Sequence, residues 1–166
     1  MTESQQRLPR SAAELPTPAE MAELAGVDVM RGIADGRLPV APISELANMW
    51  LAEVREGHVV FEAEPRFAHY NPMGTVHGGW FGILLDSAMA CAVMTRLPRG
   101  HGYTTLEYKI NLLRPVFEET GTLRAVGRSI HAGRRTATAE GRLEDRSGRL
   151  YATGTMTCMV MKLPAS

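Results

Sequence analysis

The segment from residue 78 to residue 95 constrains the fold more than any other part of the chain. It is almost wholly apolar and contains a single charged side chain, Asp86. It is too long for a typical strand, and it is rich in alanine, leucine and methionine, which favour helices. A helix that is apolar on all sides has to be buried. We therefore predict a helix over residues 78–95 that the rest of the chain surrounds.

The remainder of the chain predicts mainly strands. Alternating apolar and polar residues are typical of strands with one buried face, and short turns between strands favour antiparallel neighbours. These patterns predict an α+β fold, in which an antiparallel meander wraps around the central apolar helix. Two strands are expected before the helix and four after it, at residues 49–54, 58–66, 103–114, 122–131, 135–145 and 150–161.

We expect residues 1–36 to form an N-terminal arm with a helix, and residues 37–166 to form the main domain. Residues 1–16 are expected to lack regular structure. Residues 17–20 then have the pattern of a capping box with proline at the first helical position, which predicts a helix over residues 18–35.

Composition limits the classes of function. A length of 166 residues with 45% hydrophobic residues suits one globular domain. No apolar run is long enough to cross a membrane, and the first residues lack the features of a secretion signal, so we expect a cytoplasmic protein. Cys91 and Cys158 are interpreted as buried apolar residues. Neither the cysteines nor the histidines have metal-ligand spacing, so no metal site is predicted.

Charge is unevenly distributed along the chain, although the net charge is zero. Residues 1–65 carry 11 acidic and 5 basic residues, whereas residues 66–166 carry 7 acidic and 13 basic residues. Basic and acidic residues are mixed, with no accompanying aromatic surface, so nucleic-acid binding is not expected. Arginine suits phosphate groups because its planar fork pairs with their oxygens. The candidates for phosphate contact are Arg114, Arg128, Arg134 and Arg135.

Asp86 is the first candidate for chemistry. No basic residue lies within eight positions of it in either direction. A charge in a buried helix is unfavourable unless it has a partner or a function. Asp86 is therefore either a hydrogen-bonded structural carboxylate or a nucleophile or general base in a dry cleft.

The residues His77, Gly78 and Gly79 stand where the helix begins. The first amides of a helix have no acceptor within it, and glycine allows close approach, so the Gly78 amide can polarise a carbonyl group. The alternative is a flexible turn. Gly78 and Asp86 are about 12 Å apart along one helix, at about 1.5 Å per residue. They can act on the same carbonyl only if one of them comes from a second copy of the chain.

Three further residues are candidates with two interpretations each. Alternation places Thr104 on the apolar face of its strand and Thr105 on the opposite face, so Thr104 is expected to bond a water or the Asp86 carboxylate, or else to be an ordinary strand residue. Asn71 either bonds the region of His77 or shapes the preceding loop. His77 is either catalytic or fixes the loop by hydrogen bonds.

Together these residues resemble the PaaI-like branch of the hotdog-fold acyl-CoA thioesterases. The matching stretches are residues 71–86 and 102–115, within a likeness that covers roughly residues 37–162. The family pattern is an asparagine, then His-Gly-Gly, then an acid eight residues after the first glycine, then Ser or Thr on the next strand. In this chain the pattern falls on Asn71, His77, Gly78, Asp86 and Thr104.

The resemblance implies the hotdog fold and the hydrolysis of acyl-CoA to a free acid and coenzyme A, with no further cofactor. It implies that Asp86 attacks the thioester or activates water, and that the Gly78 amide binds the carbonyl oxygen across a dimer interface. Homodimers that pair into tetramers are expected. Gly79 and Trp80 are additional candidates for contact with the substrate, whose acyl group is either aromatic or of medium chain length.

Other functions remain as alternatives. A non-catalytic hotdog protein that binds acyl-CoA would be expected to lack the acid or to carry a DNA-binding domain, and this chain has Asp86 and no helix-turn-helix pattern. A hotdog dehydratase or hydratase would use a histidine and an acid in other positions. A purely structural dimer would leave Asp86 unexplained.

Overall fold

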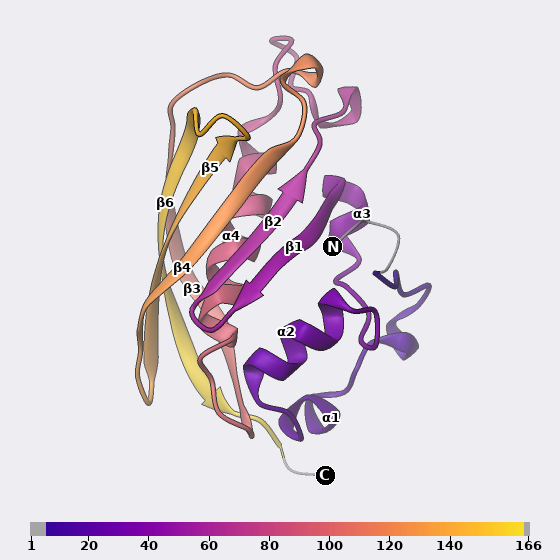
Figure 1. Ribbon diagram of the computed structural model, residues 1–166, viewed down its shortest axis with the longest axis vertical. Coiled ribbons are helices and arrows are strands. Elements are labelled where there is room, and N and C mark those ends of the chain that lie inside the picture. The colour runs from indigo at the N-terminus through magenta and orange to yellow at the C-terminus, as the bar shows by residue number, and fades with distance from the viewer. Residues whose placement is uncertain (1–5, 165–166) are drawn as a thin grey trace.

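The computed structural model describes residues 6–164, in which a six-stranded antiparallel sheet curves around one long helix (Figure 1). That helix is α4, Gly78–Met94, which agrees with the predicted helix to within one residue. The α+β prediction, with a sheet wrapped around an apolar helix, is confirmed. Among the described residues, no helix is long and apolar enough to span a membrane. The strands are β1 Met49–Arg55, β2 His58–Ala63, β3 His101–Leu112, β4 Leu123–Ala132, β5 Thr136–Asp145 and β6 Leu150–Lys162.

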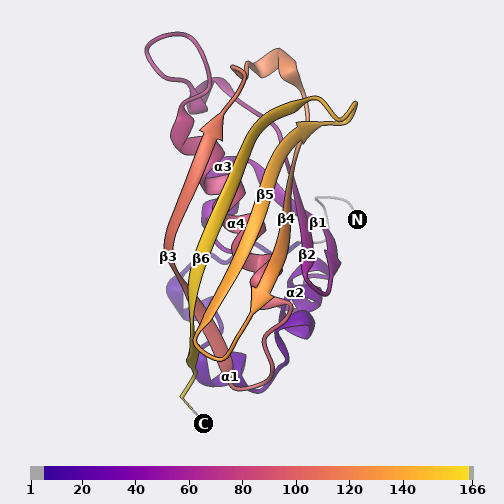
Figure 2. The same ribbon diagram turned by 90° about the vertical axis from the view of Figure 1, so that its left-hand side faces the viewer.

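The strand order is β1-β2-β4-β5-β6-β3, which corrects part of the predicted meander. Strands β1 and β2 form a hairpin, and β4, β5 and β6 are consecutive both in the chain and in the sheet. β3 is not beside either of the strands that neighbour it in the chain. β3 pairs with β6 at one edge of the sheet, and β4 pairs with β2. Figure 2 shows β3 and β1 at the two opposite sides of the sheet. The alternation of residues along a strand shows which face is buried, but it does not show which strand lies beside it. The sequence therefore did not reveal that the chain crosses from one part of the sheet to another between β3 and β4.

Three glycines that lie side by side allow α4 to approach the sheet closely. Gly127, Gly141 and Gly154 are paired neighbours on β4, β5 and β6. A Cβ atom on Gly127 would lie 2.0 Å from the carbonyl oxygen of Ala88, and one on Gly141 would lie 2.8 Å from Cγ of Met89. The row of glycines therefore forms a groove, which receives the backbone of α4 at Gly127 and the side chain of Met89 at Gly141 and Gly154.

The N-terminal arm contains two helices where a single one was predicted. α1 covers Pro18–Ala22 and begins with the predicted capping box, whereas α2 covers Gly26–Ala34. The break has a tertiary cause. Gly26 lies against the end of α4, where a Cβ atom would be 1.8 Å from the carbonyl oxygen of Met94. The Gly26 amide also donates to the carbonyl of Leu97 at 3.0 Å.

The prediction that residues 1–16 lack regular structure is wrong for part of this segment, and residues 1–5 lie outside the described residues. The Gln6 side-chain amide bonds both the backbone N–H and the carbonyl of Leu51, at 3.1 and 2.6 Å. It thereby satisfies backbone groups on edge strand β1. A 3-10 turn follows at Ala12–Glu14. The arm is joined to the body by a further short helix, α3, Ile43–Ala47.

Substitution of Gly127 tests the glycine groove. Gly127→Ala places a methyl group against the α4 backbone, which has no room to move, so we expect a loss of about 3 kcal/mol in the free energy of unfolding. Gly154→Ala is the matched control, because its new Cβ atom would meet the flexible end of Met89 at 3.2 Å. We expect that variant to stay within about 1 kcal/mol of the native chain. Denaturant unfolding measures both, and equal losses would contradict the groove.

Candidate functional site

Asp86 lies near the middle of α4, on a side of the helix that is only half buried. Its Oδ1 accepts a hydrogen bond of 3.0 Å from the Thr105 hydroxyl on β3. Among residues 6–164, no basic side chain forms an ion pair with it. Burial raises the pKa of the Asp86 carboxyl above its usual value of 3.8, and the Thr105 hydrogen bond opposes part of this rise. The result is a carboxylate of increased basicity.

Thr105, and not Thr104, is the hydrogen-bond partner of Asp86, which corrects the prediction. The register of β3 against β6 shifts between Thr105 and Glu107, so Leu106 is an extra residue in the strand. Such a bulge moves every side chain beyond it to the opposite face. Tyr108 follows the bulge, and its hydroxyl lies against Gly82 of α4. Thr104 precedes the bulge and is exposed.

A pocket of about 410 Å³ opens beside Asp86, between α4 and α2. Asp86, Ser87, Thr104 and Thr105 line its polar part. Most of its apolar wall comes from segments that are distant from Asp86 in the chain. It includes Met30 and Ile33 of α2, Val40, Met49 of β1, Phe61 of β2 and Tyr103 of β3.

Burial keeps the thiols of both cysteines in their neutral form. Burial raises the pKa of the Cys91 thiol, which lines the same pocket, to about 12 and that of the Cys158 thiol to about 11. Both thiols are therefore neutral at physiological pH. Within the described part of the chain, no group of three or more His, Cys, Asp or Glu side chains has an arrangement that could hold a metal ion.

The start of α4 presents one free backbone amide. His77 is the N-cap residue, and its Nδ1 accepts a hydrogen bond of 2.9 Å from the Gly79 amide. This contact gives His77 a structural role and occupies the Gly79 amide. The Gly78 amide, at the first helical position, has no acceptor within the helix. It also has none elsewhere among the described residues.

Asn71 shapes the loop that leads into α4. Its side-chain oxygen accepts from the Met73 amide at 2.8 Å, and its side-chain nitrogen donates to the Thr75 hydroxyl at 3.0 Å. Of the two interpretations of Asn71, the turn-forming one therefore describes its contacts. The loop is fixed further by the His77 amide, which donates to the carbonyl of His69 at 2.8 Å.

Gly78 and Asp86 face different hollows. Gly78 lines a second depression of about 310 Å³, together with Asn71, Leu112 and Arg114. Asp86 is absent from that lining, and Gly78 is absent from the lining of the Asp86 pocket. Within one subunit the free amide and the carboxylate therefore line two separate hollows, which are called half-sites below.

Trp80 is part of the core and not of a pocket wall, which corrects its assignment as a substrate contact. Its side chain is 4% exposed, and its indole N–H donates to the carbonyl of Ala47 at 2.8 Å. Its ring also stacks on that of His69 at 5.4 Å. Trp80 follows the two glycines in the sequence, which suggested a binding role. Its side chain instead points into the core, towards α3.

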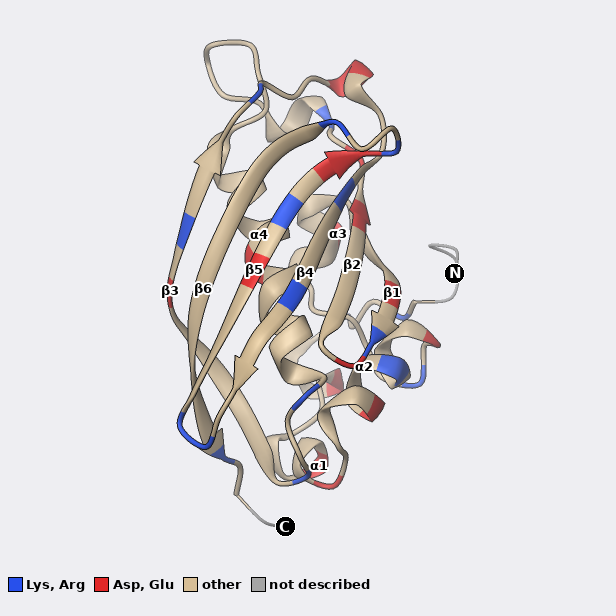
Figure 3. Ribbon diagram, turned by 60° about the vertical axis from the view of Figure 1, so that its left-hand side comes forward, with Lys and Arg blue, Asp and Glu red and all other residues tan. Residues whose placement is uncertain are grey.

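The four candidate arginines do not converge within one subunit. Arg114 follows β3 beside Gly78, and its guanidinium donates to the carbonyl of Leu150. Arg128 is exposed on β4 and pairs with Glu140 at 3.6 Å. Arg134 and Arg135 lie in the β4–β5 turn, at the opposite end of the molecule from the end of β3 (Figure 3). Of the four, Arg114 alone adjoins a half-site described above.

Comparisons with known proteins agree with this arrangement. The model of the thioesterase superfamily matches residues 73–152, which include α4 and β3. A phenylacetic acid degradation-related protein from Ralstonia eutropha is 30% identical, with a TM-score of 0.70 over 82% of this chain and 99% of that chain. A search of curated proteins found no match.

Two other solved structures are similar. A variant of the phenylacetic acid degradation protein PaaI from Thermus thermophilus is 30% identical, with a TM-score of 0.64 over 72% of this chain and 98% of that chain. A Streptococcus mutans protein solved with bound acetyl-CoA is 26% identical, with a TM-score of 0.63 over 70% of this chain and 90% of that chain. On this sequence identity and the shared fold, the chain belongs to the thioesterase superfamily, in its PaaI-like hotdog branch.

Proposed function

We propose that this protein hydrolyses acyl-CoA thioesters to a free acid and coenzyme A. One observation carries the proposal: Asp86 is a carboxylate without an ion-pair partner among the described residues, held by Thr105 at the side of a pocket. A structural carboxylate would be expected to have its charge compensated. The similarity to a protein that binds acetyl-CoA supports coenzyme A as the leaving group.

Two groups divide the chemistry in this proposal. The Gly78 amide donates a hydrogen bond to the thioester carbonyl oxygen as negative charge develops on it. Asp86 acts on the carbonyl carbon, either by direct attack or by taking a proton from the attacking water. The carbon–sulfur bond then breaks, and coenzyme A leaves as its thiolate. After direct attack, water hydrolyses the anhydride formed on Asp86 and releases the free acid. After attack by water, the free acid forms directly and the proton taken by Asp86 passes to the thiolate. Arg114, beside Gly78, is the arginine best placed to meet a phosphate of coenzyme A.

The two half-sites require a second subunit. We propose a homodimer in which β3 of one subunit pairs with β3 of the other, which brings their α4 helices side by side. β3 is an edge strand of 12 residues, and an unpaired edge of this length is a template for pairing. Its apolar side chains are exposed in the single subunit, including Leu106 at 57% and Leu112 at 52%. Pairing of these dimers into tetramers remains an expectation.

Replacement of Asp86 tests the catalytic role. Asp86→Asn preserves the side-chain volume and removes the charge, so we expect kcat to fall by at least about 10²-fold. Burial raises the pKa of Asp86, so the folded state is more stable with this carboxyl protonated and loses that stability as pH rises through the pKa. The asparagine variant should therefore melt at the same or a higher temperature at neutral pH.

The measurements are release of free thiol from a panel of acyl-CoAs and the melting temperature. Asp28→Asn, on the exposed side of α2, is the matched control and should leave both unchanged. Near-normal kcat in folded Asp86→Asn protein would contradict the mechanism. Tight binding of acyl-CoA by the native protein without any turnover would favour the alternative of a non-catalytic binding protein.

The pH dependence of kcat/KM tests the Thr105 contact. Only the ionised carboxylate is active, so kcat/KM should rise with pH through a pKa above the usual value of 3.8 for aspartate. Thr105→Val removes the hydrogen bond that lowers this pKa, so the inflection should move to higher pH. Thr104→Val is the matched control and should leave the inflection in place. A shift caused by Thr104→Val alone would overturn the assignment.

Mixing two inactive variants tests the shared site. Gly78→Pro removes the free amide while keeping a residue that suits the first helical position, and Gly78→Ala, which keeps the amide, is its control. In a mixed dimer of Gly78→Pro and Asp86→Asn chains, one of the two sites regains both groups. Random exchange of subunits should therefore restore about a quarter of the native activity. Absence of restoration in exchanged dimers would place both groups in one subunit.

A further inference from the structure

The pocket beside Asp86 has most of its polar side chains around that residue, and its remaining lining is mainly apolar, with Ser44 as a further polar residue. Asp86 is its single charged residue, and no arginine, lysine or histidine among the described residues lines it. Cys91 and Tyr103 add neutral groups, since burial raises the pKa of each. A pocket with this lining suits an uncharged, largely apolar group, because it offers no cationic side chain to a phosphate or a second carboxylate.

On the side formed by β1 and the segment from α2 to α3, this pocket is bounded by a wall that is about one side chain thick. A second hollow of about 230 Å³ lies on the other side, lined by residues that include Gln6, Leu8, Trp50 and Arg66. Val40, Ser44 and Met49 line both hollows and therefore separate them. All three side chains are buried. The wall is held in place because the Val40 amide donates to the carbonyl of Arg7 at 3.0 Å.

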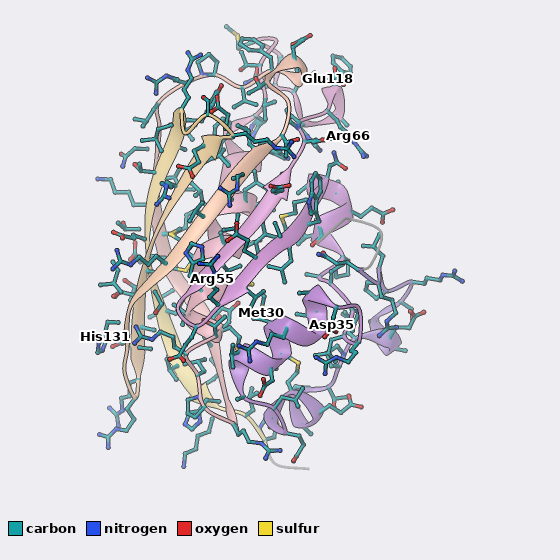
Figure 4. All side chains as sticks on the ribbon, in the orientation of Figure 1. Met30, Asp35, Arg55, Arg66, Glu118 and His131 are labelled. Carbon is teal, nitrogen blue, oxygen red and sulfur yellow. The ribbon has the colours of Figure 1, made fainter. Side chains whose placement is uncertain are left out.

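The N-terminal arm supplies much of the enclosure. Met30 and Ile33 of α2 line the pocket on the side opposite α4. Figure 4 shows Met30 on the side of α2 that faces β1. The segment between α2 and α3 contributes Val40 and Ala41. These residues lie far before Asp86 in the sequence, yet they bound the space next to it.

We infer that this pocket receives the acyl part of the substrate, which is uncharged and apolar, and that the wall of Val40, Ser44 and Met49 sets the longest acyl group that the enzyme accepts. The inference rests on the proposed thioesterase function. The acyl group enters where its carbonyl meets Asp86, and extends between α2 and α4. Each methylene that the pocket buries favours the complex until the chain reaches the wall.

A series of straight-chain acyl-CoAs of increasing length measures the limit. For the native enzyme, kcat/KM should rise about fourfold for each added methylene and then fall at a definite length. Phenylacetyl-CoA, measured alongside this series, shows whether an aromatic acyl group also fits. An acyl-CoA with a terminal carboxylate, matched in length to the best substrate, should be hydrolysed at least about tenfold more slowly, because the pocket has no cationic side chain to pair with that charge.

Three variants localise the limit. Val40→Ala thins the wall and should move the optimum to longer chains. Ile33→Phe fills the pocket from its half-buried α2 side and should move the optimum to shorter chains. Val29→Ala is the matched control, because Val29 is also buried on α2 and lines neither hollow. It should leave the optimum unchanged.

The outcomes separate the inference from the function on which it rests. Hydrolysis with the same length optimum in Val40→Ala and Ile33→Phe as in the native enzyme would overturn the inference and leave the thioesterase activity intact. Failure of the native protein to hydrolyse any acyl-CoA would overturn the proposed function. In that case, calorimetric titration with uncharged straight-chain primary amides tests the pocket directly, and a length limit that the two variants do not move would overturn the inference as well.

Discussion

The close packing of α4 against the sheet is the interaction on which the rest of the structure depends. The helix is apolar on every side, so it can exist in water only when other elements cover it. Gly127, Gly141 and Gly154 remove the side chains that would hold it away from β4, β5 and β6, and Ala88 meets the sheet through its backbone. The sheet curves around this contact, and its two edges leave one side of the helix uncovered.

The candidate site follows from that uncovered side. Asp86 projects where the sheet does not cover the helix, so it is half buried instead of wholly enclosed. Burial raises the pKa of this carboxyl, and the hydrogen bond that Thr105 donates favours the ionised form and opposes part of the rise. The same helix carries the free Gly78 amide at its start. A rigid helix therefore fixes both groups, and its length separates them into two half-sites that a single subunit does not join.

The N-terminal arm completes the enclosure that the sheet leaves open. α2 packs over the gap between the edges of the sheet, and Gly26 locks its start to the end of α4. Substrate selection and catalysis thus have different origins in the proposed enzyme. The reactive groups belong to α4 and β3, whereas the space available to the acyl group is bounded largely by α2, β1 and the segment that joins them.

The sequence by itself determined the buried helix and the strand segments, and it singled out Asp86 and Gly78 as candidates for catalysis. These predictions depend on local periodicity, on helix geometry and on the unfavourable free energy of burying a charge. All three can be judged from residues that are close together in the sequence. Only the tertiary structure decided that β3 lies beside β6, that Thr105 and not Thr104 meets Asp86, and that Trp80 belongs to the core. A one-residue bulge reverses the faces of a strand without changing its alternation beyond that point. Pairing partners and pocket walls join residues far apart in the chain, so they are set by packing and not by local sequence.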